Sequence, residues 1–335
     1  MTRSFPATRR TALQSLLVAS LAPSALAQAR TTSKAVAWPT QPIKLLIGFP
    51  AGSVQDLSAR AISPGLAAAL GQSVIVDNKA GASGTIAADM VSKANDSHTF
   101  GVMNNSQLTV AKLLSPKIGY DPARDLAPIA LIGTTPLLLV VSAAAPGLAG
   151  SEHLHWLRQL GEQGNYGSPG IGTPGHLGME LLKSRASLQT THIPYPGNPQ
   201  VINAIIGGQL QAGLMPPGLA MQQVRAGKLK AVGVTSEQRS LFAPDLPTLR
   251  ELDVRGAELE LWSALAGPAG LAPAIVEKLA TAVISVVKDQ ETRERLLSAG
   301  WQPTPSNYEG LAQRMRADTR TMGGIITLRN IRAEG

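Results

Sequence analysis

The chain has no cysteine, and aromatic residues make up only 4% of its 335 residues. The first absence excludes a disulfide scaffold, a thiolate metal site and a thiol nucleophile. The second disfavours a base-stacking platform for nucleic acid and a sugar cleft built on tryptophan faces. Only 16% of the residues are charged, whereas 44% are hydrophobic. That apolar share is sufficient for packed cores, and the length predicts about two domains.

The formal net charge of +8 lies partly at the N-terminus. Arg3 and the Arg9-Arg10 pair precede an apolar run over 12–22, which the tripeptide Ala25-Leu26-Ala27 follows. A basic start, a short apolar run and a small-x-small site predict a secretory signal peptide over residues 1–27. The sequence around the arginine pair also resembles a twin-arginine export motif, so both export routes stay open.

Cleavage near Ala27 would leave a mature chain of 308 residues (335 − 27) with a net charge of +5 (8 − 3). We expect this chain outside the cytoplasm. It has no further run of some 18 apolar residues, so insertion into a membrane is not expected. Its remaining Lys and Arg residues are scattered, which disfavours nucleic acid as a partner.

Apolar runs and helical patterns alternate along the mature chain. The first set predicts strands at 43–49, 73–77 and 98–103 and helices at 56–70, 85–94 and from after residue 106 to about 114. A second set follows an apolar run at 137–142. It predicts strands at 165–168, 192–195, 212–215 and 231–235 and helices at 154–160, 175–186, 199–206 and 219–226. This alternation is typical of open, largely parallel α/β sheets flanked by helices.

The chain ends with three amphipathic helical patterns that have no strands of their own, at 274–288, 291–299 and 308–327. The economical arrangement packs these helices on the first sheet. The chain would then pass between two lobes twice, near residues 138–142 and 258–266. We therefore expect a first lobe of residues 38–138 and 262–335 and a second lobe of residues 141–259.

The motifs of common enzymes are missing or incomplete. Residues 170–175 match G-x-G-x-x-G, but the dinucleotide fold also needs an acidic residue about 20 positions on, and residues 188–198 contain none. The chain has no P-loop motif, no G-x-S-x-G elbow and no paired carboxylates at a recognisable spacing. No catalytic residue and no cofactor are predicted.

The histidines do not form a metal-binding pattern. His153 and His155 are two positions apart on an expected helix, so their side chains point to different sides. His176 lies in the first turn of a helix, where it either packs against the helix end or supports the loop before it. His192 lies on a short strand and is interpreted as a packing residue. No metal site is predicted.

Three loops lie at the carboxyl ends of expected strands, at residues 49–56, 104–106 and 168–173. Ligands of open α/β sheets bind at this edge. Glycines expose backbone amides, helix N-termini carry partial positive charge, and Ser and Thr add short donors. These loops can therefore capture a carboxylate or phosphate without a charged side chain. Two such lobes facing each other would form a clamp that closes about a hinge.

The mature chain resembles the Bug family, the TctC-type solute receptors of tripartite tricarboxylate transporters, over about residues 38–330. The similar segments include Trp38-Pro39-Thr40-Gln41-Pro42-Ile43-Lys44, Phe49-Pro50-Ala51-Gly52, Val76-Asp77-Asn78-Lys79-Ala80-Gly81, Tyr120-Asp121-Pro122, Ser168-Pro169-Gly170-Ile171-Gly172-Thr173-Pro174-Gly175-His176-Leu177 and Pro244-Asp245-Leu246-Pro247-Thr248. The resemblance implies a two-lobed periplasmic binding protein of the Venus-flytrap, type II-like fold with two crossover strands.

The resemblance also implies a ligand and a site. Family ligands are small carboxylates, held by loop amides, hydroxyls and ordered waters. Carried onto this chain, the first-lobe residues of the site are Phe49, Gly52, Ser53, Val54, Gln55 and Ser106. Those of the second lobe are Ser168, Gly172, Thr173, His176 and Met215.

Some positions depart from the family pattern. Ala51 and Ser53 stand where the family usually has Pro and Gly, and Lys79 replaces an Arg. Pro216 follows Met215 where other members often have a polar or acidic residue, which disfavours an amino-acid ligand.

The resemblance implies a non-enzymatic, monomeric receptor that serves the membrane subunits of a TctA/TctB-type transporter. A sensory binding protein that serves a signalling partner is an alternative. An exported hydrolase is a third possibility, but it lacks a visible nucleophile motif.

Overall fold

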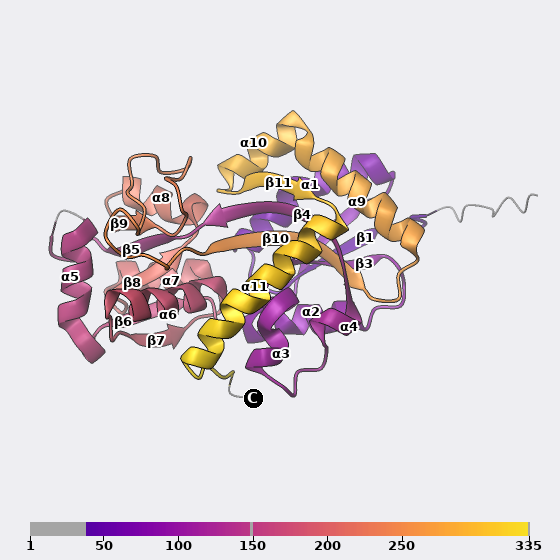
Figure 1. Cartoon of the computed structure of the whole chain (residues 1–335). Coiled ribbons are helices and arrows are strands. Elements are labelled where there is room, and N and C mark those ends of the chain that lie inside the picture. The colour runs from indigo at the N-terminus through magenta and orange to yellow at the C-terminus, as the bar shows by residue number, and fades with distance from the viewer. Residues whose placement is uncertain (1–37, 148–149, 334–335) are drawn as a thin grey trace, which may run out of the picture. The chain divides into compact units, whose positions relative to one another are not determined.

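The computed structural model describes residues 38–147 and 150–333 (Figure 1). The signal peptide predicted over residues 1–27 lies outside this part of the chain. The described residues form two sheets with helices packed against them. The predicted two-sheet α/β fold is therefore confirmed.

The first sheet has six strands in the order β11-β4-β10-β3-β1-β2. Their bounds are β1 Ile43–Ile47, β2 Val74–Asn78, β3 Thr99–Asn104, β4 Leu126–Pro136, β10 Glu260–Pro268 and β11 Gln302–Ser306. Strand β1 pairs in parallel with β2 and β3. Strand β10 runs antiparallel to β3 and β4, and β11 runs antiparallel to β4.

The second sheet has five strands in the order β7-β6-β8-β5-β9. Their bounds are β5 Leu138–Ser142, β6 Asn165–Ser168, β7 Thr191–Pro194, β8 Ala212–Met215 and β9 Leu229–Val234. Strand β6 is parallel to β7 and β8, whereas β5 is antiparallel to β8 and β9. The expectation that each sheet is mainly parallel is therefore wrong, because both sheets are mixed.

The error arises from strands that the sequence patterns do not reveal. The 11-residue strand β4 contains Pro128 and ends at Pro136, and β11 contains Pro303 and Pro305. Prolines interrupt the apolar pattern, although an edge strand such as β11 tolerates them. Strand β4 carries the chain out of the first sheet and β10 brings it back, and these two strands lie antiparallel side by side.

The two crossings between the sheets lie next to each other. Only Leu137 separates β4 from β5, so the run over 138–142 is a strand of the second sheet and not itself a crossing. The buried Thr235 joins this crossing to the returning one. Its hydroxyl accepts a hydrogen bond from Leu137 N at 2.9 Å and donates one to Leu259 O at 2.6 Å. Its backbone also bonds to both segments.

Helices cover both sheets. Those that pack on or beside the first sheet are α1 Val54–Leu70, α2 Thr85–Ser92, α3 Ala111–Leu114, α4 Pro122–Asp125, α9 Pro273–Lys288, α10 Gln290–Ser298 and α11 Tyr308–Leu328. Those on the second sheet are α5 Gly150–Leu160, α6 Pro174–Ala186, α7 Asn198–Ile206 and α8 Pro217–Arg225. The three C-terminal helices return to the first sheet, as expected, and α11 (yellow in Figure 1) also reaches α6.

The segment after β3 differs from the helix expected there. It begins as a π-helix, η2 (Ser106–Val110), and continues as the short α3. Asn104 is still part of the strand, and Asn105 joins the two. π-Helical turns occur frequently at functional sites, because the wider turn changes the direction of side chains.

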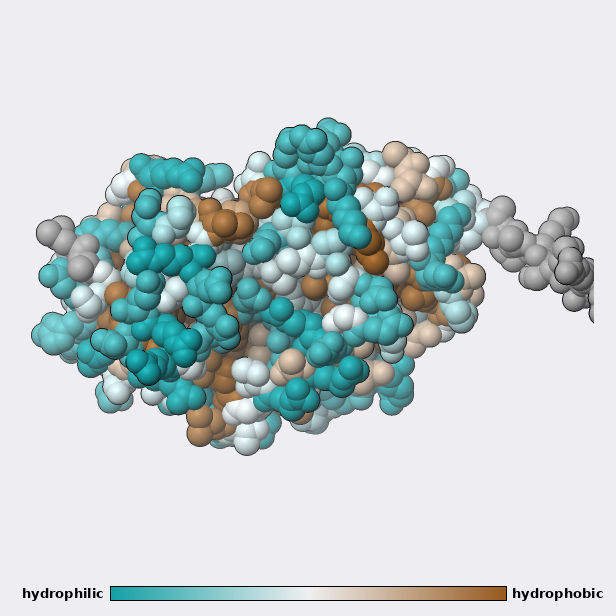
Figure 2. Space-filling view, turned by 45° about the horizontal axis from the view of Figure 1, so that its top comes forward, coloured by the Kyte–Doolittle hydropathy of each residue, from teal (hydrophilic) through white to brown (hydrophobic). Residues whose placement is uncertain are grey.

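The face of the molecule in Figure 2 is largely polar. Hydrophilic residues cover most of the face in Figure 2, and the hydrophobic ones form small patches between them. No helix within residues 38–147 and 150–333 combines the length and the apolar character that a bilayer crossing requires.

The central position of β10 generates a stability prediction. Leu265 is 0% exposed on this strand, between Val102 of β3 and Ala130 of β4. We expect Leu265→Ala to lower the free energy of unfolding by about 2–5 kcal/mol, because it leaves a cavity in the core. The measurement is urea denaturation followed by circular dichroism.

The matched control is Leu241→Ala. This side chain is 75% exposed, so the same chemical change should alter stability by less than about 0.5 kcal/mol. Equal losses in the two variants would contradict the position of β10 in the core.

Candidate functional site

A cavity of about 580 Å³ lies where loops of the two sheets face each other. Its walls come from segments that follow β1, β2, β3, β6 and β7. These are Gly48–Phe49, Ala80–Thr85, Ser106, Pro169–Ile171 and Pro194–Pro196. The other lining residues are Ala111, Leu114, Ser115, Ile118 and Ala333. The cavity thus lies outside the carboxyl ends of strands, where open α/β proteins bind ligands.

The loops of the first sheet meet at one corner of this cavity. A Cβ atom added to Gly48 would collide with the backbone of Gly84, so only glycine allows this approach. Gln107, which is fully buried, donates from Nε2 to Gly84 O at 2.9 Å and accepts at Oε1 from Asn104 N at 3.0 Å. These bonds bring Phe49, Ser83 and Ser106 into one wall.

Ser106 supplies an unused hydrogen-bonding group at this corner. The residue is 3% exposed, and its backbone amide donates to Asn104 Oδ1 at 3.0 Å. Its hydroxyl, in contrast, has no hydrogen-bond partner among the described residues. A buried hydroxyl without a partner is unfavourable, so a ligand atom that accepts a hydrogen bond from it would be stabilised there.

The neighbouring Asn105 fixes this corner to the rest of the protein. Its side chain donates to Glu260 O at 2.9 Å and to Asp318 Oδ2 at 2.8 Å, and accepts from Trp262 N at 3.1 Å. Glu260 and Trp262 begin β10, and Asp318 lies on α11. The start of η2 is therefore tied to the strand that returns from the second sheet.

The loop between β1 and α1 uses its own donors internally. The amide of Gly52 donates to Asp56 Oδ2 at 2.9 Å, and the amide of Ser53 donates to Pro50 O at 3.1 Å. Burial raises the pKa of Asp56, but hydrogen bonds from Arg60, Gly52 and Asn78 outweigh it and lower the pKa overall. The Asp56 carboxylate thus occupies the amide of Gly52, so this amide is not available to a ligand.

The loop before α6 is held in the same way. Gly172 N donates to His176 Nδ1 at 2.9 Å, and the Thr173 hydroxyl donates to Gly170 O at 2.7 Å. Ser168 Oγ and His192 Nε2 are 2.7 Å apart. His176 therefore supports the loop, and His192 both packs and makes a hydrogen bond.

The imidazole rings of His176 and His192 stack with their centroids 3.9 Å apart. Burial lowers the pKa of His176 to about 4. Burial and the neighbouring His176 lower the pKa of His192 to about 3. Both rings are therefore neutral at pH 7.

Glu180, which is buried on α6, forms ion pairs with Lys183 and with Arg329. It accepts from the Tyr166 hydroxyl at 2.7 Å, from Lys183 at 2.6 Å and from Arg329 at 2.9 Å. Burial raises the pKa of Glu180, but the hydrogen bonds from Lys183 and Tyr166 outweigh it and bring the pKa to about 2. Because Arg329 follows α11, this pair connects the C-terminal helix to α6.

The structure brings two of the predicted site residues to the cavity wall, Phe49 and Ser106. The others lie outside the lining, and several of them shape the loops from behind. They are Gly52, Ser53, Val54, Gln55, Ser168, Gly172, Thr173, His176 and Met215. Sequence reasoning missed the loops 80–85 and 194–196 and the distant Ala333. The glycines at 81 and 84 were the available signal for the first of these loops.

Glycines allow the loops of the two sheets to touch across the cavity. A Cβ atom on Gly170 would collide with Ser83 Oγ, and one on Gly172 would collide with Leu114. Both glycines also have positive φ, +118° and +76°, which other residues rarely adopt. The structure is thus closed over the cavity at these contacts.

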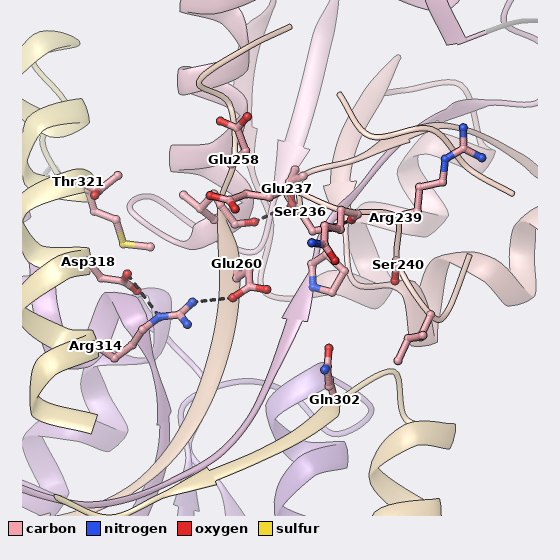
Figure 3. Close-up of a pocket in the computed structure, with 16 residues that line it drawn as sticks. Ser236, Glu237, Arg239, Ser240, Glu258, Glu260, Gln302, Arg314, Asp318 and Thr321 are labelled. Carbon is pink, nitrogen blue, oxygen red and sulfur yellow. Dashed lines mark hydrogen bonds and ion pairs between the residues drawn. The ribbon is translucent and has the colours of Figure 1, made fainter. Parts of the chain in front are cut away.

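A second cavity of about 620 Å³ lies beside the two crossings (Figure 3). Figure 3 shows Arg314 of α11 between Glu260 and Asp318, to which it pairs at 2.8 and 3.7 Å. Glu237 and Glu258 also line it. Carboxylates outnumber the arginines on this wall, so an anionic ligand would be repelled. No group of His, Asp and Glu suited to a metal occurs within residues 38–147 and 150–333.

Two sheets with adjacent crossings and a cavity between their loops define a periplasmic solute-binding protein, the class to which the similar solved structures belong. The chain belongs to the TctC family, "Tripartite tricarboxylate transporter family receptor", whose model matches residues 58–331. The predicted family is therefore confirmed. Receptors of this family are periplasmic, bind small carboxylates and work with tripartite transporters.

Known relatives match most of the chain. The UPF0065 protein in the gbd 5' region of Cupriavidus necator is 33% identical over 89% of this chain and 90% of its own length. MatC of Rhodopseudomonas palustris, solved with bound malate, is 28% identical with a TM-score of 0.80, over 86% of this chain and all of that one. R. palustris Rpa4515, solved with adipate, is 27% identical with a TM-score of 0.83, over 87% and 97%.

The buried histidines generate a pH prediction. An unfolded chain protonates His176 below about pH 6.5, whereas the folded chain does so only near pH 4. Stability is therefore lost as pH falls through this window, by roughly 3 kcal/mol at about 1.4 kcal/mol per pKa unit. We expect His176→Asn, which keeps an acceptor for Gly172 N, to reduce this loss. Melting temperatures between pH 4 and 7 measure it.

His155→Asn is the control, because His155 is exposed on α5 and its loss should leave the pH profile unchanged. An unaltered profile in His176→Asn would contradict the burial of a neutral imidazole at this position.

Proposed function

We propose that the chain is a periplasmic receptor that captures a small organic carboxylate in the 580 Å³ cavity and delivers it to the membrane subunits of a tripartite transporter. The first lobe comprises residues 38–136 and 260–333, and the second comprises residues 138–258, with the crossings at Leu137 and Leu259. The mature protein starts near residue 28, acts as a monomer and closes about the crossings at Leu137 and Leu259. It needs no metal or cofactor.

The single observation that carries this proposal is the Ser106 hydroxyl, buried on the cavity wall without a partner among the described residues. A carboxylate is a strong acceptor, and charge-assisted hydrogen bonds are stronger than neutral ones. Bound malate and adipate in MatC and Rpa4515 support the same class of ligand. The +5 charge of the mature chain favours anions weakly.

We propose no catalytic role for the pair of Ser168 and His192 near the cavity. Ser168 is 0% exposed and its hydroxyl also donates to Gly170 O, so it is not available to attack a substrate. The low pKa of His192, about 3, makes this imidazole a weak base. Hydrolysis of an ester panel that depended on Ser168 would overturn this part of the proposal.

The test of the receptor is a thermal-shift screen against small carboxylates, because a ligand of the folded state raises the melting temperature with its concentration. We expect Ser106→Ala to weaken the strongest hit by about 1–3 kcal/mol, measured by isothermal titration calorimetry. The melting temperature without ligand should hardly change, since the hydroxyl makes no internal hydrogen bond.

Ser306→Ala is the matched control. Ser306 Oγ is also buried without a partner in the described part of the chain, but it lies on β11, away from the cavity lining. Its loss should leave affinity unchanged. Stabilisation by neutral sugars but by no carboxylate would overturn the proposal.

Closure of the lobes generates a second prediction. Gly170→Ala should weaken carboxylate binding at least tenfold, because the new methyl group would collide with Ser83 across the cavity. Gly208→Ala is the control, because Gly208 also has a positive φ, +74°, but no atom lies within 4 Å of the new Cβ. We expect Gly208→Ala to lower stability without lowering affinity. Equal affinities in the two variants would show that the Gly170 contact is not needed for binding.

A further inference from the structure

The chain turns back toward the first lobe after α11, which contacts both α6 and α3 (Figure 1). The helix ends at Leu328, and Asn330 adopts a left-handed φ of +49°. Asparagine adopts this conformation more readily than most other residues. Ile331 is then 9% exposed in the core, and its amide donates to Ile326 O at 3.0 Å. Residues 329–333, here called the return segment, are therefore an ordered part of the fold.

The return segment is bonded to both lobes. At its start, Arg329 Nε donates to Glu180 Oε2 at 2.9 Å, on α6 of the second lobe. At its end, Ala333 N donates to Leu114 O at 3.1 Å, the last residue of α3 in the first lobe. The second bond joins backbone atoms, so a different side chain at position 333 leaves it intact.

Ala333 and Ser106 belong to the same wall of the 580 Å³ cavity. Ser106 begins η2, which continues into α3, and Leu114 ends α3. At 1.5 Å per residue, the two ends of this helical stretch are at most roughly 12 Å apart. Because Ala333 is bonded to Leu114, a ligand whose carboxylate contacts Ser106 would extend along this stretch toward Ala333.

The space at that end of the wall depends on the side chain at position 333. Leu114 cannot move aside, because it lies so close to Gly172 of the second lobe that a Cβ atom there would collide with it. Ala333 is half-buried and presents a single methyl group. A larger side chain would fill part of the cavity, and overpacking is unfavourable.

Resting on the proposed function, we infer that Ala333 limits the length of the carboxylate that this receptor accepts. Arg329 acts as a positioning residue, because its bond to Glu180 holds the return segment against the cavity. The ligand class is thus a carboxylate whose length is set by the distance from Ser106 to Ala333.

The experiment uses two series of linear acids with four, six and eight carbons. They are butyrate, hexanoate and octanoate, and succinate, adipate and suberate. Affinities for the mature protein are measured at pH 7.5 by calorimetry. The length ratio is the affinity for the longest acid that the unmodified chain binds, divided by the affinity for the four-carbon acid of that series.

We expect Ala333→Leu to lower the length ratio at least tenfold, because the larger side chain overlaps only with the far end of a long acid. Affinity for the four-carbon acid should stay within twofold, which also shows that the variant is folded. Ala226→Leu is the matched control. Ala226 is exposed at the end of α8, outside the cavity lining, so the same chemical change there should leave the ratio unaltered.

Arg329→Gln tests the positioning role. Without the bond to Glu180, the return segment can move aside, so we expect the length ratio to rise at least threefold, opposite to the effect of Ala333→Leu. Arg329→Lys keeps a cation facing Glu180 and should restore the original ratio. A merely structural role would weaken all acids equally, and that result would overturn the assignment of Arg329.

The outcomes separate this inference from the proposed function. Acids that bind but show the same length ratio in Ala333→Leu, or an equal fall in Ala226→Leu, would overturn the inference and leave the carboxylate receptor standing. Binding of the four-carbon acids alone would also overturn it, because a limit that short lies nearer to Ser106 than to Ala333. The absence of binding in both series would overturn the receptor proposal as well.

Discussion

The hydrogen bonds of Thr235 are the constraint on which the rest of the structure depends. Its hydroxyl joins Leu137, where the chain enters the second sheet, to Leu259, where it leaves. If the two chain crossings were not bonded to each other, the sheets could slide and twist. Because Thr235 bonds both crossings, rotation of the sheets about one axis is favoured. The loops that line the cavity can therefore meet with the small tolerances that Gly170 and Gly172 require.

Local patterns predicted most of the fold, and long-range pairing produced the errors. The runs at 43–49 and 212–215 are apolar and bounded by turn residues, so β1 and β8 could be predicted from their own sequence. Strand β4 could not, because Pro128 and Gly133 break its pattern and its stability comes from pairing with β10 and β11. Whether two strands pair in parallel or antiparallel also depends on distant strands, so the sequence patterns could not predict that both sheets are mixed.

The site shows the same limit. Strand-end loops and glycines predicted the edge of the sheets at which the cavity lies and named Ser106, which lines it, but they could not show which donors are already bonded. The side chains of Asp56 and His176 occupy the amides of Gly52 and Gly172, and these bonds depend on helix geometry. Ala333 reaches the cavity from the far end of the chain, and nothing in its local sequence indicates this.

The position of Ala333 has a practical consequence. Its amide is bonded to Leu114, and it forms part of the cavity wall just beyond the Arg329–Glu180 pair. A purification tag, a fluorophore or a surface linker joined directly after this residue would therefore begin at the wall of the candidate cavity and could occupy part of it.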